Sequence, residues 1–255
     1  MTVVKPTGGR AQAGLTPEMA ACVAELAQAL EAIFTPLQQL GQALSACWIG
    51  TTIVDRQPFT TSEIAGLQPR VFELLDSEPA VDSAGYVLAE NILADRARCL
   101  DWWHRSDDHH YQPLILELDL TSPDCYDYYT MDWFRAGVDE GRRFVSGPLI
   151  DLPCAAVYVF TFSQPVVVEG TFLGIAGADV ALSRYEDHLV PPLLDLTEPA
   201  VVINDERRVI VSNDSRWTTG EKVRTFPVVG RDWQVVVPVA GDIGWHLAVA
   251  QTNHA

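Results

Sequence analysis

The sequence predicts an α+β fold in which one long helix precedes an antiparallel sheet. Apolar residues recur every three or four positions over residues 23–44, which is the spacing of one helix face. Later, apolar and β-branched runs flank the polar turn Glu169-Gly170, a pattern typical of a hairpin. A second hairpin pattern covers residues 200–212. A chain of 255 residues has room for one large or two small domains.

The composition narrows the class of protein. Hydrophobic residues make up 48% of the chain, which is enough for a packed core, and the formal net charge is −17. Nucleic-acid or anionic-membrane binding needs basic patches, so neither is expected. The five cysteines are widely spaced and odd in number, as in reduced intracellular proteins. Residues 1–14 lack an apolar core of signal-peptide length, so no secretion signal is expected, and no uninterrupted apolar run reaches about 18 residues. These observations predict a cytoplasmic protein without membrane association.

The chain begins with a predicted disordered tail, residues 1–14, followed by a helix over residues 15–49. Thr16 suits the N-cap and Pro17 the first helical position. The apolar stripe is expected to pack on its own chain, with a homodimer through this helix as the alternative. A short strand is expected at 48–54, a helix at 62–75, strands at 84–89 and 114–120, and a helix with a loop at 126–137.

The most apolar part of the chain follows. Residues 156–162 predict a strand that Pro165 ends, and 166–168 and 172–180 predict two more strands. Gly174 and Gly177 are expected to leave room on the sheet face. Asp179 lies inside an apolar run, and burying an unpaired carboxylate is costly. A neighbouring donor or a ligand must therefore satisfy it.

A smaller β-rich lobe is predicted at the C-terminal end, over residues 198–252. A helix at 183–194 precedes it, the hairpin at 200–203 and 209–212 opens it, and strands at 224–229, 232–239 and 245–250 complete it. With few helices, this lobe is expected to be too small to hold a ligand well.

Four motifs occur in order between residues 126 and 180. They are Tyr126 followed by Trp133-Phe134, an S-x-P-x-I-D turn at 146–151, a Y-x-x-T-F-S-x-P-V strand starting at Tyr158, and G-x-x-G-A-D at 174–179. In these motifs the chain resembles the Cache family of small-molecule sensor domains, specifically the double-Cache architecture. The resemblance implies a PAS-like ligand-binding lobe over residues 50–197 and a reduced second lobe over 198–252. Family members usually lie outside the cell between membrane helices, whereas this chain is expected to stand alone in the cytoplasm.

The resemblance also implies a ligand pocket. In the amino-acid-binding branch, aromatic residues and an arginine hold the ligand carboxylate, and an aspartate holds its ammonium. Tyr126, Trp133 and Asp179 match that motif, Phe134 is a near match without the hydroxyl, and Met131 stands at the arginine position. Methionine cannot supply the paired donors that a carboxylate prefers.

An amine or other organic cation is therefore the favoured ligand, boxed by aromatic rings that include Tyr158, with Asp179 as counter-charge. A small carboxylate or amino acid comes next, held by Arg105, Arg135 or His104. Trp103 belongs to a segment that the family places close to the pocket.

Other interpretations stay open. The aromatic residues also suit plain core packing, and Asp179 also suits a structural hydrogen-bond role. Residues 107–110 (Asp-Asp-His-His) carry metal-ligand types that would suit a metal-dependent hydrolase, although a solvated loop is favoured and no metal or cofactor is expected. No G-x-S-x-G or P-loop motif supports another enzyme. A protein-interaction module with a filled pocket is the third alternative. A sensor of this kind is expected to signal through a separately encoded regulator or kinase.

Overall fold

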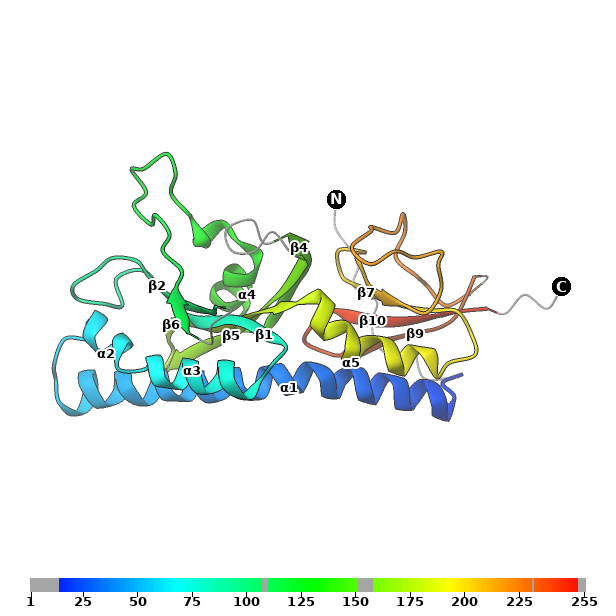
Figure 1. Ribbon diagram of the computed structural model, residues 1–255, viewed down its shortest axis with the longest axis horizontal. Helices are drawn as coiled ribbons and strands as arrows, with labels where there is room; N and C mark the ends of the chain where they lie inside the picture. Colours follow the sequence, from blue (N-terminus) through cyan, green and yellow to red (C-terminus); the bar gives the residue numbers. More distant parts are fainter. Residues whose placement is uncertain (1–13, 107–109, 151–157, 231, 252–255) are drawn as a thin grey trace. The chain divides into compact units, whose positions relative to one another are not determined.

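The computed structural model describes residues 14–106, 110–150, 158–230 and 232–251. They divide into two compact units, one of residues 14–30 with 186–251 and one of residues 31–185. The unit boundaries fall within helices α1 (Pro17–Trp48) and α5 (Leu182–Leu194), both labelled in Figure 1. The lobe boundaries expected from the sequence, 50–197 and 198–252, stay a prediction.

Helix α1 confirms the long N-terminal helix. The Thr16 hydroxyl accepts a hydrogen bond from the Met19 N–H at 3.3 Å, and Pro17 follows the cap. Val23 is partly exposed, whereas six stripe residues are at most 3% exposed, as expected for packing on the protein's own chain: Leu26, Leu30, Ile33, Leu37, Leu40 and Leu44. The strand expected at 48–54 is wrong, because a π-helical turn, Ile49–Val54, continues the helix there. The Thr52 hydroxyl donates to the Trp48 carbonyl at 2.7 Å and so supports the helical path.

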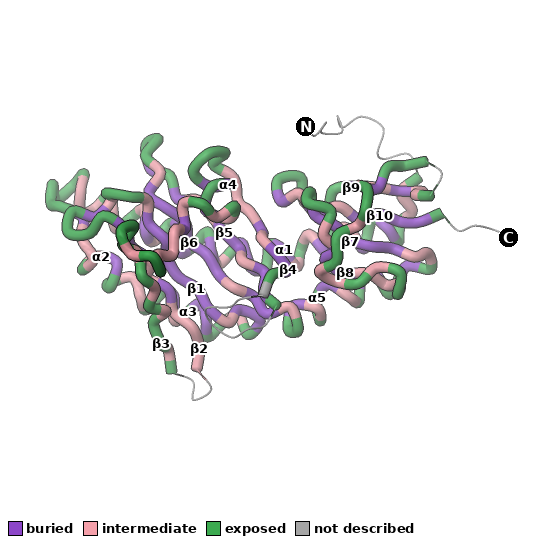
Figure 2. Tube along the Cα trace, turned by 90° about the horizontal axis from the view of Figure 1, so that it is seen from above, coloured by how far each residue is buried: buried purple, intermediate pink, exposed green. Residues whose placement is uncertain are grey.

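The larger unit contains a six-stranded antiparallel sheet of order β3-β2-β1-β6-β5-β4. Its strands are β1 (Val81–Leu88), β2 (Cys99–Arg105), β3 (Tyr111–Pro113), β4 (Phe144–Ile150), β5 (Tyr158–Val168) and β6 (Thr171–Ala181). The central strands β1 and β6 are almost entirely buried (Figure 2). The predicted fold class, a long helix followed by antiparallel sheets, is confirmed.

Strands β5 and β6 form the predicted hairpin, whose turn has φ angles of 49° at Glu169 and 83° at Gly170. Pro165 does not end the strand, because it pairs with Ile175 inside β5. The pairing of β5 with β4 stops at Ser163–Phe144, so no described strand requires an N–H at Pro165 on that side. The start of the predicted strand, at 156 and 157, lies outside the described residues.

The two faces of this sheet have different coverings, since side chains alternate along each strand. One face packs on α1 and on α3 (Gln68–Ser77). There Phe162 contacts Phe34 with ring centroids 5.2 Å apart, and the Tyr86 hydroxyl donates to the Leu40 carbonyl at 3.2 Å. The opposite face carries α4 (Asp132–Glu140) and a 3-10 turn, Tyr128–Thr130, as predicted for residues 126–137 (Figure 1).

Three further predicted elements differ from the structure. The helix expected at 62–75 is two helices, α2 (Thr61–Ala65) and α3, because α2 ends at Gly66 and a proline starts α3. The segment at 114–120 is irregular, and Ile115 is 86% exposed, so its alternating pattern does not form a strand. The segment at 224–229 is also irregular. Residues 107–109 of the proposed metal-ligand run lie outside the described residues.

The smaller unit contains a four-stranded sheet of order β8-β7-β10-β9. Its strands are β7 (Ala200–Asn204), β8 (Val209–Ser212), β9 (Trp233–Ala240) and β10 (Trp245–Ala250), which confirms the predicted hairpin and two of the three further strands. One sheet face buries Trp245 and Leu247 completely. The other packs against Trp217, Val223 and Phe226 from the long connection between β8 and β9.

His246 is expected to make the stability of the smaller unit pH-dependent. Its side chain is 18% exposed and contacts the Phe226 ring at 5.1 Å, and burial lowers its pKa below 6.5, although Asp205 partly opposes this shift. The unfolded state therefore binds more protons below pH 6.5, so stability falls as the pH drops. We expect the urea midpoint to decrease from pH 7 to pH 5.5, and His246→Phe to reduce that decrease. Replacement of the exposed His110 with Gln is the matched control, and an equal slope in both variants would contradict the role of His246.

Candidate functional site

Asp179, on β6, receives hydrogen bonds from three side chains. The Ser83 hydroxyl donates to its Oδ2 at 2.8 Å, the Thr161 hydroxyl donates to its Oδ1 at 2.6 Å, and the Trp102 indole N–H lies 3.2 Å from Oδ2. The same indole N–H is 2.8 Å from the Ser83 oxygen. The carboxylate is half-buried, so these donors offset the cost of removing it from water.

The strand register brings these groups together. Asp179 pairs directly with Ser83 on β1 and with Thr161 on β5, so the three side chains share one sheet face. Each hydroxyl has a single proton and donates it to Asp179, which leaves only acceptor capacity on the two oxygens. The three residues thus form a negatively charged patch of acceptors, called the acceptor patch below.

Trp102 forms one wall beside the acceptor patch. A Cβ at Gly177 would lie 2.9 Å from the Trp102 ring, so this ring occupies the space that the missing side chain leaves. At Gly174 a Cβ would lie 2.2 Å from the Val87 carbonyl oxygen, which is backbone. The room expected at these glycines is therefore filled by the protein itself, as close packing between neighbouring strands requires.

A cluster of aromatic rings lies on the same sheet face. Phe134 is fully buried and meets Tyr128, Phe172 and Trp133 edge-on, with ring centroids 4.9, 5.7 and 5.8 Å apart. Trp133 and Tyr126 are only partly buried and pack against this cluster, which includes Trp102. The Ser163 hydroxyl donates to the Trp133 carbonyl at 2.9 Å and ties the start of α4 to the sheet.

The structure thus gathers four of the eight predicted site residues on one face: Asp179, Trp133, Tyr126 and Phe134. Phe134 serves the core there, because none of its surface is exposed. Met131 precedes α4 as its N-cap without a side-chain capping bond.

The other three predicted residues point away from Asp179. Trp103 and Arg105 alternate with Trp102 and His104 along β2, so they face α3, where Trp103 contacts Phe72 at 5.2 Å. Tyr158 shares the face of Phe160 and is 51% exposed. The expectation that these three side chains lie close to the pocket is therefore wrong, because the strand register places them on the opposite face of the sheet.

Ser83, Thr161 and Trp102 were not singled out from the sequence. Ser83 and Thr161 are polar residues inside apolar strands, which is the same signal that drew attention to Asp179. Trp102 could not be distinguished from its neighbour Trp103 in the sequence, because either indole ring could form a wall of the site.

Arg98 holds the segment that leads into α4. It is 9% exposed, and its guanidinium is 2.6 Å from Glu90 and 2.9 Å from Asp127. It also lies over the rings of Tyr128 and Tyr129, at 5.3 and 5.1 Å. Burial acts to lower the pKa of Arg98, but the bonds to both carboxylates outweigh this and raise it.

Arg98→Ala is expected to cost about 2–3 kcal/mol of unfolding free energy, because it removes two charge-assisted hydrogen bonds. Both carboxylates keep contact with water, so the loss stays below the value for a fully buried pair. Urea unfolding measures it. Arg184→Ala, which removes an exposed ion pair with Asp82, is the control and should cost less than about 1 kcal/mol. Equal losses in the two variants would contradict an anchoring role.

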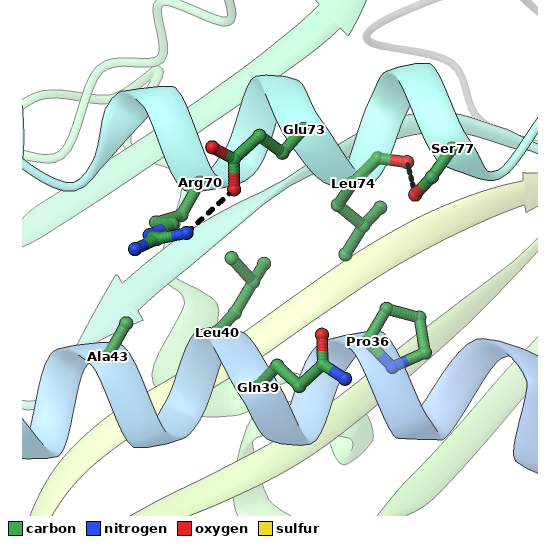
Figure 3. A pocket seen from close by; sticks show the side chains of 8 residues that line it. All are labelled: Pro36, Gln39, Leu40, Ala43, Arg70, Glu73, Leu74 and Ser77. Carbon is green, nitrogen blue, oxygen red and sulfur yellow. Dashed lines mark hydrogen bonds and ion pairs between the residues drawn. The ribbon is translucent and has the colours of Figure 1, made fainter.

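A separate groove of about 420 Å³ lies between α1 and α3 (Figure 3). Leu40 and Leu74 line it, and Arg70 and Glu73 form an ion pair of 2.9 Å at its side. These helices cover the sheet face opposite the acceptor patch, so the groove is not part of the Asp179 site.

Comparison with known protein families gives a match for part of the larger unit. Residues 68–187 match the family model described as the first PDC sensor domain of methyl-accepting chemotaxis protein-like receptors. This segment is a PDC sensor domain of the Cache type. The resemblance seen in the motifs is thereby confirmed. None of the curated proteins matches the chain.

Solved structures share the PDC fold over nearly the whole chain. "Methyl-accepting Chemotaxis protein X" aligns with a TM-score of 0.62 at 11% identity, covering 92% of this chain and 94% of that one. The Pseudomonas aeruginosa PAO1 amino acid chemoreceptor PctB domain, in complex with L-Arg, aligns at 0.55 and 17% identity, covering 91% of each chain. The extracellular domain of the putative histidine kinase soHK1S-Z6 aligns at 0.54 and 17%, covering 91% and 92%. At identities of 11% and 17%, these alignments establish a shared fold and nothing further.

The expected cytoplasmic location is wrong. Structures that share the PDC fold include domains described as extracellular parts of histidine kinases. In addition, one helix, Pro17–Val54, is long and apolar enough by length and composition to cross a membrane. The sequence criterion required an uninterrupted apolar run and so passed over a helix with a few charged residues. The expectation of no membrane association is withdrawn with it.

Proposed function

We propose that the PDC domain is a sensor that reversibly binds a small organic cation at the acceptor patch. The observation that carries this proposal is the commitment of both hydroxyl protons, on Ser83 and Thr161, to the Asp179 carboxylate. Ser83 and Thr161 therefore present only acceptor capacity beside the negatively charged Asp179 carboxylate, and a primary ammonium with its three donors is the complementary group.

The surroundings support a cation. Trp133 and Tyr126 are partly exposed aromatic residues on the same face, and aromatic rings attract organic cations. The solved PDC domains carry L-Arg, GABA or L-valine by their titles, and all three ligands contain an amino group. An amino group is therefore the shared chemistry that we transfer to this chain.

A carboxylate at the acceptor patch is the weaker candidate because the two arginines that were expected to bind it are not available there. Met131 has no donor to offer. Arg135 forms an exposed ion pair with Asp139 at 3.0 Å, and Arg105 lies on the opposite sheet face. We therefore place amines ahead of carboxylates and amino acids.

The proposal makes this chain a binding protein rather than an enzyme, in agreement with the description of the family as sensor domains. We further propose a regulator or kinase as its signalling partner. The similar structures are titled as chemotaxis proteins and histidine kinases, which supports such a partner.

A thermal-shift screen with matched ligands tests the proposal. Alkylamines, carboxylic acids and alcohols of equal carbon number are compared at the same concentrations. An amine at 100 times its dissociation constant should add about 2.7 kcal/mol of stability, and the other two series should add little. Stabilisation by carboxylic acids without stabilisation by amines would reverse the assignment. A protein that no member of the three series stabilises would refute it.

A further inference from the structure

A row of polar residues crosses the large sheet on the face of the acceptor patch. Starting from Asp179, Ser83 on β1 pairs with His104 on β2, and His104 pairs with Gln112 on β3. Directly paired residues of antiparallel strands share a face, so the row extends from the acceptor patch to the sheet edge. Trp102, two residues before His104, lies on this face as well.

His104 is the unsatisfied member of this row. Its Nδ1 is buried and has no hydrogen-bond partner in the part of the chain that the structure describes. Buried polar atoms in folded proteins nearly always have a partner, because leaving them unpaired is costly. Neither residue paired with His104 bonds to this nitrogen, since the Ser83 hydroxyl bonds to Asp179 and Trp102 instead and Gln112 is exposed. An additional group is therefore expected to meet this nitrogen.

We propose that His104 binds the far end of the ligand whose amino group occupies the acceptor patch, and so selects long bifunctional amines. This inference rests on the proposed function. His104 and Asp179 are two strands apart, which corresponds to roughly 10 Å between their backbone positions. The ligand class is a linear amine that carries an oxygen acceptor, a carboxylate or a hydroxyl, at its other end.

The spacing excludes compact ligands from using both groups. In an α-amino acid the ammonium and the carboxylate are attached to the same carbon, so the molecule cannot reach from the acceptor patch to His104. An ω-amino acid or amino alcohol with several methylene groups can span the distance. Its methylene groups would pass the Trp102 side chain, which adjoins both Ser83 and Gly177.

Calorimetric titration of the full chain tests the inference. The ligands are ω-amino acids from glycine to aminooctanoic acid, amino alcohols of the same lengths, and plain alkylamines. The wild-type protein should bind the best-fitting bifunctional ligand about tenfold more tightly than the alkylamine of equal length, which is the value of one good hydrogen bond. The two bifunctional series distinguish a carboxylate from a hydroxyl.

His104→Ala should abolish this tenfold preference and leave the alkylamine affinity unchanged. His104→Asn, which retains a nitrogen near the position of Nδ1, should restore part of it. Gln112→Ala is the matched control and should keep the preference. An equal loss of affinity for all ligands in His104→Ala, or a wild-type protein without a length preference, would overturn the inference while the proposed function stands. A wild-type protein that binds no amine would overturn both.

Discussion

Asp179→Asn is expected to weaken amine binding by about 30- to 4,000-fold. Removing one charge from a buried, hydrogen-bonded ion pair costs about 2–5 kcal/mol, and about 1.4 kcal/mol corresponds to a factor of ten. Asparagine has nearly the same shape and keeps one oxygen for the Ser83 or Thr161 hydroxyl. The loss should therefore come from the missing charge rather than from a changed fold. Calorimetric titration with an alkylamine measures it.

Two matched variants separate the charge from the local hydrogen bonds. Thr161→Val removes one donor to Asp179 but keeps the carboxylate, so it should reduce affinity by about tenfold or less. Ser83→Ala should behave in the same way. If Asp179→Asn binds amines as well as the wild-type protein does, Asp179 only holds the sheet together, and the acceptor patch is not a binding site.

The sequence predicted those elements whose pattern is long or local. The stripe on α1 repeats over many turns, and the β5–β6 hairpin carries its own turn at Glu169-Gly170. Segments 48–54 and 114–120 were misassigned because their patterns are short. Whether such a segment becomes a strand depends on a partner strand, and the structure describes none beside either segment. The prediction that Pro165 ends a strand failed for the same reason. A strand can contain a proline where no neighbouring strand needs its N–H, and this depends on where β4 stops pairing with β5.

The site was predicted only in part because it depends on register between distant strands. Asp179 drew attention as an acid in an apolar run, but Ser83 is 96 positions away in the chain. The adjacent residues Trp102 and Trp103 lie on opposite faces, and a shift of one residue exchanges them. The sequence therefore located the sheet and the acid, whereas the choice between Trp102 and Trp103 required the pairing of β2 with β1.

Phe134→Ala is expected to destabilise the PDC domain by about 3–5 kcal/mol, because it removes a fully buried ring and leaves a cavity. The cavity would deprive Tyr128, Tyr129 and Phe172 of their contacts with this ring, at centroid distances of 4.9, 4.8 and 5.7 Å. Phe134→Leu, which fills more of the space, should cost less. Urea unfolding followed by fluorescence measures the change.

Trp133→Ala should affect amine binding more than stability, because Trp133 is only partly buried at the edge of the same cluster. We expect a smaller loss of stability than for Phe134→Ala, together with a loss of amine affinity that corresponds to about 1–2 kcal/mol of cation–π attraction. Conversely, the folded fraction of Phe134→Leu should bind amines with nearly unchanged affinity. If Phe134→Leu loses affinity and Trp133→Ala does not, the guest molecule enters the core of the cluster, and the site extends from Asp179 toward Phe134 rather than toward His104.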